Sequence, residues 1–172
     1  MKNLTKFFAL AIVIMGFSAS SFAQVTATAT ASATIVTPIA ISKVLDLNFG
    51  NVAVQSTTGG TVILTPAGTR STGGAGGVTL PASVGTVTAA SFTVTGTTGY
   101  TFSITLPATP TTVTSGSNNM TVSAFTSTPT AIGTLTSGTQ TVLVGATLNV
   151  AAGQAAGTYL SAVAFPVTVN YN

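Results

Sequence analysis

The chain has 172 residues and very few ionisable side chains: Lys and Arg together number 4, Asp and Glu together 1, and His and Cys are absent. Without His or Cys, the sequence cannot build Ser–His or Cys–His nucleophile pairs. A single carboxylate cannot supply the paired acids of glycoside hydrolysis or hold a zinc or two-metal site. We therefore expect no enzymatic activity, no cofactor, and no catalytic, cofactor-binding or metal-binding residues.

Residues 1–23 have the pattern of a secretory signal peptide. Lys2 and Lys6 precede an apolar run over residues 7–17, and small residues before Gln24 suit a cleavage site after Ala23. The apolar run is shorter than the roughly 18 residues that a membrane-spanning helix needs. We expect a cleaved signal helix, no integral membrane segment in the mature chain, and secretion to the periplasm, outer surface or extracellular space.

Once the signal is removed, Lys43, Asp46 and Arg70 are the charged side chains that remain. High hydrophobicity with little charge argues against disorder. Scattered cations cannot form the basic patch that nucleic acid requires, so we expect no nucleic-acid partner. Low charge also removes a common protection against edge-to-edge association of sheets, which favours self-association.

The first segment of the mature chain, Val25–Ile35, alternates strictly between two kinds of side chain. Period-two alternation predicts a strand with one face suited to burial. Thr and Ser occupy the other face. The residues on the apolar face are Val25, Ala27, Ala29, Ala31, Ala33 and Ile35. Two interpretations stay open: this segment is the first strand of its own domain, or residues 24–36 form an arm for strand exchange with a neighbour.

Short strand patterns separated by turn residues follow. Asp46 lies in a short apolar segment that ends at Gly50, where it either caps the turn or pairs with Lys43. Glycines between residues 95 and 99 favour a hairpin joining its two neighbouring strands. Residues 66–77 are expected to be a loop or a hairpin tip. The predicted strands of this stretch are 61–64, 91–94, 100–106 and 120–125.

The C-terminal third contains two longer strand patterns. Residues 141–150 are predicted to form a strand with a bulge at Gly145. After a turn over residues 151–157, the pattern of residues 158–171 predicts the last and longest strand. Its apolar face would carry Val163, Phe165, Val167, Val169 and Tyr171.

These patterns together predict an all-β protein. About eight short strands with turns at this spacing are typical of an antiparallel β-sandwich. We expect residues 24–172 to form a single sandwich domain, with residues 24–36 as the segment that either belongs to it or extends from it as an arm.

Several segments resemble known families. LNFGNV at residues 47–52, residues 91–107, residues 144–160 and the ending FPVTVNYN are, in this order, similar to domain-of-unknown-function family 4402, a group of bacterial exported domains. The sequence is also distantly similar to spore coat protein U and to chaperone–usher pilin-like domains. The resemblance implies an immunoglobulin-like or pilin-like sandwich outside the inner membrane, and it implies no reaction.

The pilin resemblance has two further implications. Pilin subunits lack one strand, and the N-terminal extension of a neighbour fills the gap. Tyr171, with Gly157 upstream, is similar to a pilin ending, and residues 25–35 then correspond to the extension. The implied partners are a second copy of the chain and a chaperone or usher.

The sequence therefore predicts an exported, non-catalytic structural or assembly protein of the bacterial cell surface, such as a pilin-like fimbrial or coat subunit. The alternative is a surface adhesin or glycan-binding module, since sugars stack on exposed aromatic rings. Tyr100 and Tyr159 are the aromatic side chains expected to be exposed.

Overall fold

The computed structural model describes residues 24–172, so the predicted signal peptide and signal helix over residues 1–23 lie outside the described residues. The chain divides into two units between Ile35 and Val36. Residues 36–172 form one compact unit. Residues 24–39 belong to no strand.

The described residues form strands, turns and irregular segments, and every pair of neighbouring strands is antiparallel. The predicted all-β antiparallel fold is therefore confirmed. No helix within residues 24–172 has the length and apolar character to cross a membrane. The strands are β1 Ala40–Leu45, β2 Asn48–Phe49, β3 Ala53–Val54, β4 Gly60–Leu64, β5 Arg70–Gly73, β6 Val78–Thr79, β7 Val87–Thr88, β8 Ala90–Thr95, β9 Thr101–Thr105, β10 Thr111–Ser115, β11 Asn118–Thr128, β12 Ile132–Thr134, β13 Thr139–Val150, β14 Leu160–Ser161 and β15 Thr168–Tyr171.

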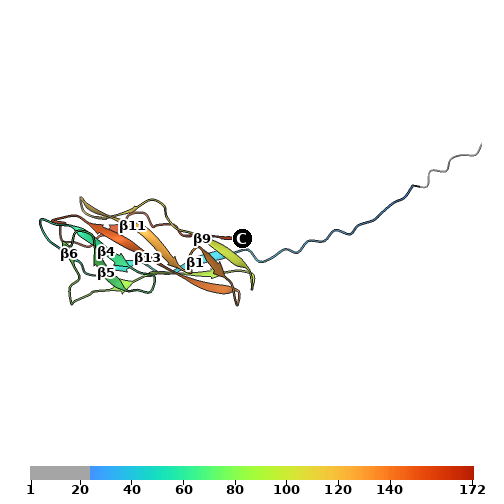
Figure 1. The fold of residues 1–172 in the computed structure, drawn as a ribbon, viewed down its shortest axis with the longest axis horizontal. Helices are drawn as coiled ribbons and strands as arrows, with labels where there is room; N and C mark the ends of the chain where they lie inside the picture. The colour runs from blue at the N-terminus through green and yellow to red at the C-terminus, as the bar shows by residue number, and fades with distance from the viewer. Residues whose placement is uncertain (1–23) are drawn as a thin grey trace, which may run out of the picture. The chain divides into compact units, whose positions relative to one another are not determined.

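The larger sheet has the strand order β1-β8-β13-β11-β10-β14, and β4 with β5 extends it beside β13. The long β13 runs along β11 through most of its length (Figure 1). Alternation explains why β13 is central, because every second side chain points into the protein. Those inward side chains are buried: Val142, Val144, Ala146, Leu148 and Val150.

Gly145 lies where β13 changes partners on one side. Residues 139–144 pair with β8, and residues 146–150 pair with β4. A side chain at Gly145 would collide with the carbonyl oxygen of Leu64, where the chain leaves β4. The predicted bulge at Gly145 is wrong: Gly145 pairs with Thr126, and the register shift lies in β11 between Ser123 and Thr126.

A second sheet, β12-β9-β15, faces part of the larger sheet and completes a sandwich. Their shared core contains residues of both sheets, including Val94 and Val142 from the larger sheet and Phe102 and Val169 from the smaller one. Phe102 is fully buried and packs against Gly133 of β12, where a side chain would collide with its ring. Two facing sheets with an apolar core between them are the predicted sandwich.

The predicted hairpin around residues 95–99 is wrong. The strands on either side of it, β8 and β9, lie in different sheets and do not pair with each other. The connection crosses from one sheet to the other, and it is held by Gly99 N–H donating to Leu135 O at 2.7 Å. Turn glycines report only that the chain reverses, and the same signal serves a hairpin or a crossing between sheets.

A second apolar cluster lies under the other half of the larger sheet. Its buried members include Val62, Val122 and Leu148, with Val78 from β6. Only the two-residue pairs β2–β7 and β3–β6 accompany this half of the sheet. The larger sheet is therefore covered by a regular sheet at one end and by short irregular segments at the other.

Residues 66–77 were expected to be a loop or a hairpin tip, and the structure contains a hairpin there. Arg70–Gly73 forms β5, which pairs with β4 in a hairpin closed by residues 65–69. Thr69 N–H donates to the side chain of Thr65 at 3.2 Å and closes this turn.

The single long strand predicted over residues 158–171 is also wrong. Strand structure is limited to β14 and β15, and the residues between them pair with no strand in the part of the chain that the structure describes. Pro166 interrupts the run, since proline cannot donate a backbone hydrogen bond to a ladder. Val163 is 77% exposed, whereas the other four predicted face residues lie in or against the sandwich core: Phe165, Val167, Val169 and Tyr171.

Candidate assembly surface

Residues 24–35 are called the arm from here on. The arm contains no strand, and all of its residues are exposed. Its two large apolar side chains are almost fully accessible, Val25 at 93% and Ile35 at 99%. Val25–Ile35 forms no strand in this structure, and both interpretations, the first strand of its own domain and an arm for strand exchange, stay predictions. Period two shows that a segment can pair, and it does not show which strand is the partner.

All six members of the predicted assembly strand share this exposure. None of them lies in a strand of the structure, and whether they pair with a neighbouring copy stays a prediction. They are Val25, Ala27, Ala29, Ala31, Ala33 and Ile35.

The compact unit contains a large open groove of about 1160 Å³. One wall is residues 45–54, the segment that follows β1, and the other wall is residues 154–165, which include β14. The floor is the inner face of β10, β11 and β13. Its apolar side chains are Val113, Met120, Val122, Leu148 and Val150.

Both walls of the groove have incompletely paired backbone. In the second wall, β14 contributes only Leu160 and Ser161 to pairing with β10, and residues 162–167 pair with no described strand. In the first wall, β2 and β3 each pair on one side only, with β7 and β6. Unpaired strand edges are sites where another strand can add.

The first wall is held in place by Arg70. Its Nη1 atom donates to the carbonyl oxygens of Phe49 and Asn51 at 2.6 and 2.8 Å. Gly50 between them has a φ of +69°, and its Cβ position is closed by Val84 O. The wall is therefore a fixed, unusual backbone conformation that one cation stabilises.

The Lys43–Asp46 pair, one of the two roles expected for Asp46, is confirmed. Lys43 Nζ donates to Asp46 Oδ1 at 2.7 Å, with both side chains mostly exposed. The turn itself is capped by a different residue, because Gly50 N–H donates to Asn48 Oδ1 at 2.8 Å. The groove thus carries a neutralised pair at its rim.

A family model described as "Domain of unknown function (DUF4402)" matches residues 39–171. The chain belongs to this family. No curated protein and no solved structure matches it.

The DUF4402 match contains every residue of the groove, whereas the arm precedes it. The sequence prediction found the arm and β15, and it missed much of the groove. β10 was not predicted, although residues 112–115 alternate between Thr and other residues. The rim residues Leu160 and Tyr159 were assigned to one long strand, so their place in an irregular wall was not foreseen.

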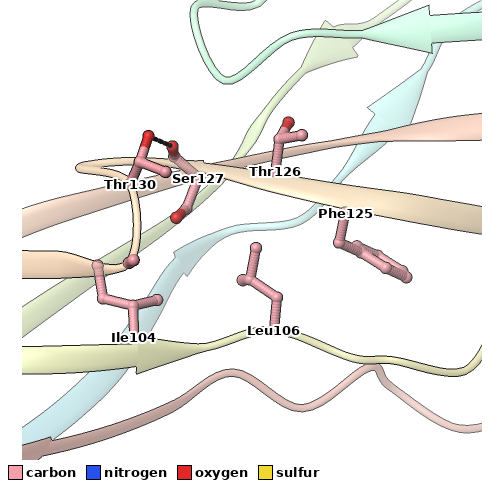
Figure 2. A pocket seen from close by; sticks show the side chains of 7 residues that line it. Ile104, Leu106, Phe125, Thr126, Ser127 and Thr130 are labelled. Atoms are coloured by element: carbon pink, nitrogen blue, oxygen red, sulfur yellow. Dashed lines mark hydrogen bonds between the residues drawn. The ribbon is translucent and has the colours of Figure 1, made fainter.

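A smaller apolar pocket of about 350 Å³ opens beside β9 and β11 of the DUF4402 domain. Ile104 and Leu106 lie below Phe125 and the end of β11 (Figure 2). Thr130 Oγ1 donates to Ser127 O at 3.2 Å, and this hydrogen bond closes the upper side of the pocket. No acid, base or amide side chain lines this pocket, so its chemistry is limited to apolar contact and hydroxyl hydrogen bonds.

The two tyrosines proposed from the sequence as aromatic binding residues differ in their surroundings. Tyr100 is 43% exposed, and its ring lies edge-on to Tyr171 with centroids 5.5 Å apart. Tyr159 is half-buried in the groove wall. Its hydroxyl donates to Ala155 O at 2.8 Å and accepts from Gln154 Nε2 at 2.8 Å. The structure does not bring the two rings into one site.

No group of three or more metal-ligating side chains occurs within residues 24–172. Buried side-chain nitrogen and oxygen atoms in the same range all have hydrogen-bond partners.

Proposed function

We propose that this DUF4402 protein is an exported, non-catalytic structural or assembly subunit of the bacterial cell surface, of the pilin-like or coat type. The observation that carries the proposal is the arm, an alternating segment whose apolar ends are 93% and 99% exposed. An uncovered segment with one face suited to burial is expected to find its partner on another molecule.

The charge distribution supports the same function. Within residues 24–172, Lys43, Asp46 and Arg70 are the acidic and basic side chains, and Lys43 and Asp46 neutralise each other. Natural sheet proteins commonly use charged residues to prevent edge pairing. A sheet protein without that protection is suited to contact with copies of itself or with a surface.

The place of action is proposed from the sequence. The signal pattern of residues 1–23 directs the chain out of the cytoplasm. The resemblance to pilin-like and spore coat domains, which covers most of the chain after the signal, supports a location in the periplasm, on the outer surface or outside the cell. A chaperone or usher partner is part of this proposal.

The test is the mass of the protein in solution. The chain from Gln24 onward is purified with and without residues 24–36, and both forms are measured by size-exclusion chromatography with light scattering. We expect concentration-dependent association of the longer form and monomers of the shorter form. A longer form that stays monomeric, with residues 24–36 protected from proteolysis, would contradict the proposal.

Tyr100 supports a second candidate function, a glycan-binding adhesin. Tyr100 is 43% exposed beside Tyr171, and exposed aromatic faces are where sugars stack. A glycan array tests it: binding that is lost in Tyr100→Ala, or in Tyr159→Ala, would support this function. An array without hits, or hits unchanged by both substitutions, would remove it.

A further inference from the structure

We infer that two copies of the compact unit pair edge to edge through β12, in antiparallel register about a two-fold axis at Gly133. The two three-stranded sheets then form one continuous sheet. The inference goes beyond the proposed function, because it needs only residues 36–172 and makes no use of the arm. A two-fold contact is closed, since each copy presents the same surface to the other.

β12 is an edge strand whose backbone is bonded on one side. It pairs with β9 alone, at one end of the order β12-β9-β15. In antiparallel pairs, residues that bond to the neighbouring strand alternate with residues whose backbone groups point away from it. Ile104 N–H donates to Ala131 O at 2.7 Å, so residue 131 bonds toward β9. By this alternation, Ile132 and Thr134 direct their N–H and C=O groups away from β9.

Two of these four outward groups already have partners in the adjoining turns. Ile132 N–H donates to Thr130 O at 2.6 Å, and Thr136 N–H donates to Thr134 O at 3.0 Å. The other two, Ile132 C=O and Thr134 N–H, have no hydrogen-bond partner within residues 24–172. Each copy thus presents one free acceptor and one free donor on the same edge.

The free groups match those of a second copy in one register. With Gly133 opposite Gly133, Thr134 of each copy lies opposite Ile132 of the other. Thr134 N–H then donates to Ile132 C=O in both directions, and both free groups of each copy are satisfied. A shift by two residues either way would set each free group opposite one that is already bonded. The pattern of free groups therefore specifies the two-fold register.

The side chains of this edge suit a neutral partner. Charged side chains commonly protect sheet edges from pairing. The edge strands β1 and β5 carry Lys43 and Arg70, whereas β12 has no charge. Ile132 is 58% exposed, and in the two-fold register it packs beside Thr134 of the other copy, as a β-branched cross-strand pair.

The apolar pocket beside β9 and β11 lies at the same margin of the sandwich. Thr130 and Ala131, which lead into β12, are among its lining residues. In the two-fold register, residues 135 and 136 of the second copy run opposite Ala131 and Thr130. The turn that follows β12 in one copy therefore passes the pocket of the other, and the axis repeats this contact at the second pocket. These contacts enlarge an interface that the short strand alone would leave small.

The contact is expected to be weak and reversible. Interfaces that bury less than about 1,200 Å² in total are typical of transient complexes. A short edge strand with one turn belongs to this class, so we expect a dissociation constant of about 0.1–1 mM. The chain without residues 24–36 is then monomeric at about 1 µM and forms dimers at about 1 mM.

Disulfide formation between cysteine variants tests the register, because the natural chain has no Cys. Differently tagged Ile132→Cys and Thr134→Cys proteins, both beginning at Gln24, are oxidised separately and as a mixture. Opposite residues have Cβ atoms about 4.5–5.5 Å apart, whereas diagonal neighbours are about 7–8 Å apart. We expect the disulfide between the two variants to form at least about fivefold faster than either symmetric disulfide. Equal rates for all three would overturn the inference.

The inter-copy hydrogen bond is tested by removing its donor. Thr134→Pro removes the free N–H at an outward position of an edge strand, where proline is tolerated. Thr134→Val is the matched control, because it keeps the N–H and loses only the hydroxyl. In sedimentation equilibrium we expect the proline to weaken dimerisation at least about tenfold and the valine less than about twofold. Equal effects would contradict pairing through β12.

A second substitution covers the case in which the proline lowers the melting temperature. Ile132→Lys places a charge on the edge itself, and Thr101→Lys places one on the neighbouring central strand β9. Both positions are exposed, so neither lysine is expected to disturb the fold. We expect Ile132→Lys alone to weaken dimerisation, since charge on an edge opposes strand pairing. An equal effect of Thr101→Lys would mean that net charge, and not the edge, controls the contact.

The outcomes separate this inference from the proposed function. If removal of residues 24–36 abolishes association and the disulfide between residues 132 and 134 is not favoured, the assembly function holds and pairing through β12 is wrong. If the chain without residues 24–36 still dimerises at high concentration and favours this disulfide, the edge contact holds whatever the arm does. If the full mature chain never associates, both are wrong.

Discussion

The hydroxyl group of Tyr171 donates a 2.8 Å hydrogen bond to the backbone carbonyl of Thr37, 134 residues earlier in the chain. The same hydroxyl accepts a 2.7 Å bond from Thr97 N–H in the crossing between the two sheets. Thr37 N–H also donates to Thr97 Oγ1 at 3.0 Å. The last strand, the sheet crossing and the start of the compact unit are therefore joined at one oxygen atom.

Tyr171→Phe is expected to lower the free energy of unfolding by about 1–3 kcal/mol, because it removes two hydrogen bonds and leaves Thr97 N–H without its acceptor. The ring and its packing against Tyr100 remain. Unfolding in urea followed by circular dichroism measures the change. Tyr159→Phe is the control: its hydroxyl binds only residues four and five positions away, and we expect a smaller loss. Equal losses would contradict the joining role of Tyr171.

Gly145→Ala is expected to be among the most damaging single substitutions in the larger sheet. The new methyl group would collide with the backbone of Leu64 and Thr65, which cannot rotate away as a side chain could. Gly68→Ala is the matched control, because Gly68 has open space around its Cβ position and only its φ of +81° opposes the change. We expect a cost of about 1–2 kcal/mol at Gly68 and a clearly larger one at Gly145, measured by thermal unfolding.

Alternation in the sequence predicted which residues of the sandwich would be buried better than it predicted their partners. In β13 the period of two reports burial correctly, since every second residue from Val142 to Val150 is buried. It could not show that this strand pairs with β8 along one half and with β4 along the other. That arrangement depends on where the chain leaves β4, which is a long-range property.

The arm and the C-terminal segment show the same limit. Val25–Ile35 has a strand pattern but no strand in this structure, because pattern describes a face and says nothing of the molecule that covers it. Residues 158–171 were predicted as one strand, and Pro166 with the wall of the groove divides them. The groove was missed because its walls are segments whose backbone lacks strand partners. The alternation of side chains along a sequence does not show where strand pairing ends.

Arg70→Met is expected to loosen the first wall of the groove. The guanidinium donates to Phe49 O and Asn51 O, and hydrogen bonds from a charged donor contribute about 1.5–3 kcal/mol each. The bond to Asn51 O is exposed to water and adds little, so we expect a loss of unfolding free energy of about 1.5–3 kcal/mol and faster hydrogen exchange at residues 49–54. Lys43→Met is the control, since it removes only an exposed ion pair of less than about 1 kcal/mol. Similar exchange in both variants would contradict this role.

Leu135→Ala and Leu160→Ala should separate folding from assembly. Leu135 is fully buried in the sandwich core, so its truncation is expected to cost about 2–5 kcal/mol of stability. Leu160 is 68% exposed at the rim, and its truncation should leave the melting temperature unchanged while weakening association. Sedimentation equilibrium and thermal unfolding of both variants check this. Loss of stability at Leu160 would place it in the core of the monomer instead.

Association through the arm is expected to depend little on ionic strength. Attraction between exposed charges is screened within about 8–10 Å at 0.10–0.15 M salt, so a contact that relies on such charges weakens as salt rises. The arm has no charged group, and the charges at the rim of the groove already pair with each other, Lys43 with Asp46. We expect the association constant to change by less than about twofold between 0.05 and 0.5 M sodium chloride. A steep fall over this range would mean that Lys43, Asp46 or Arg70 binds a partner across the interface, which contradicts association through a neutral arm. Lys43→Met with Asp46→Asn is the matched control, because it removes the pair and leaves the apolar floor intact. If the neutral arm carries the contact, this double variant associates as the parent protein does.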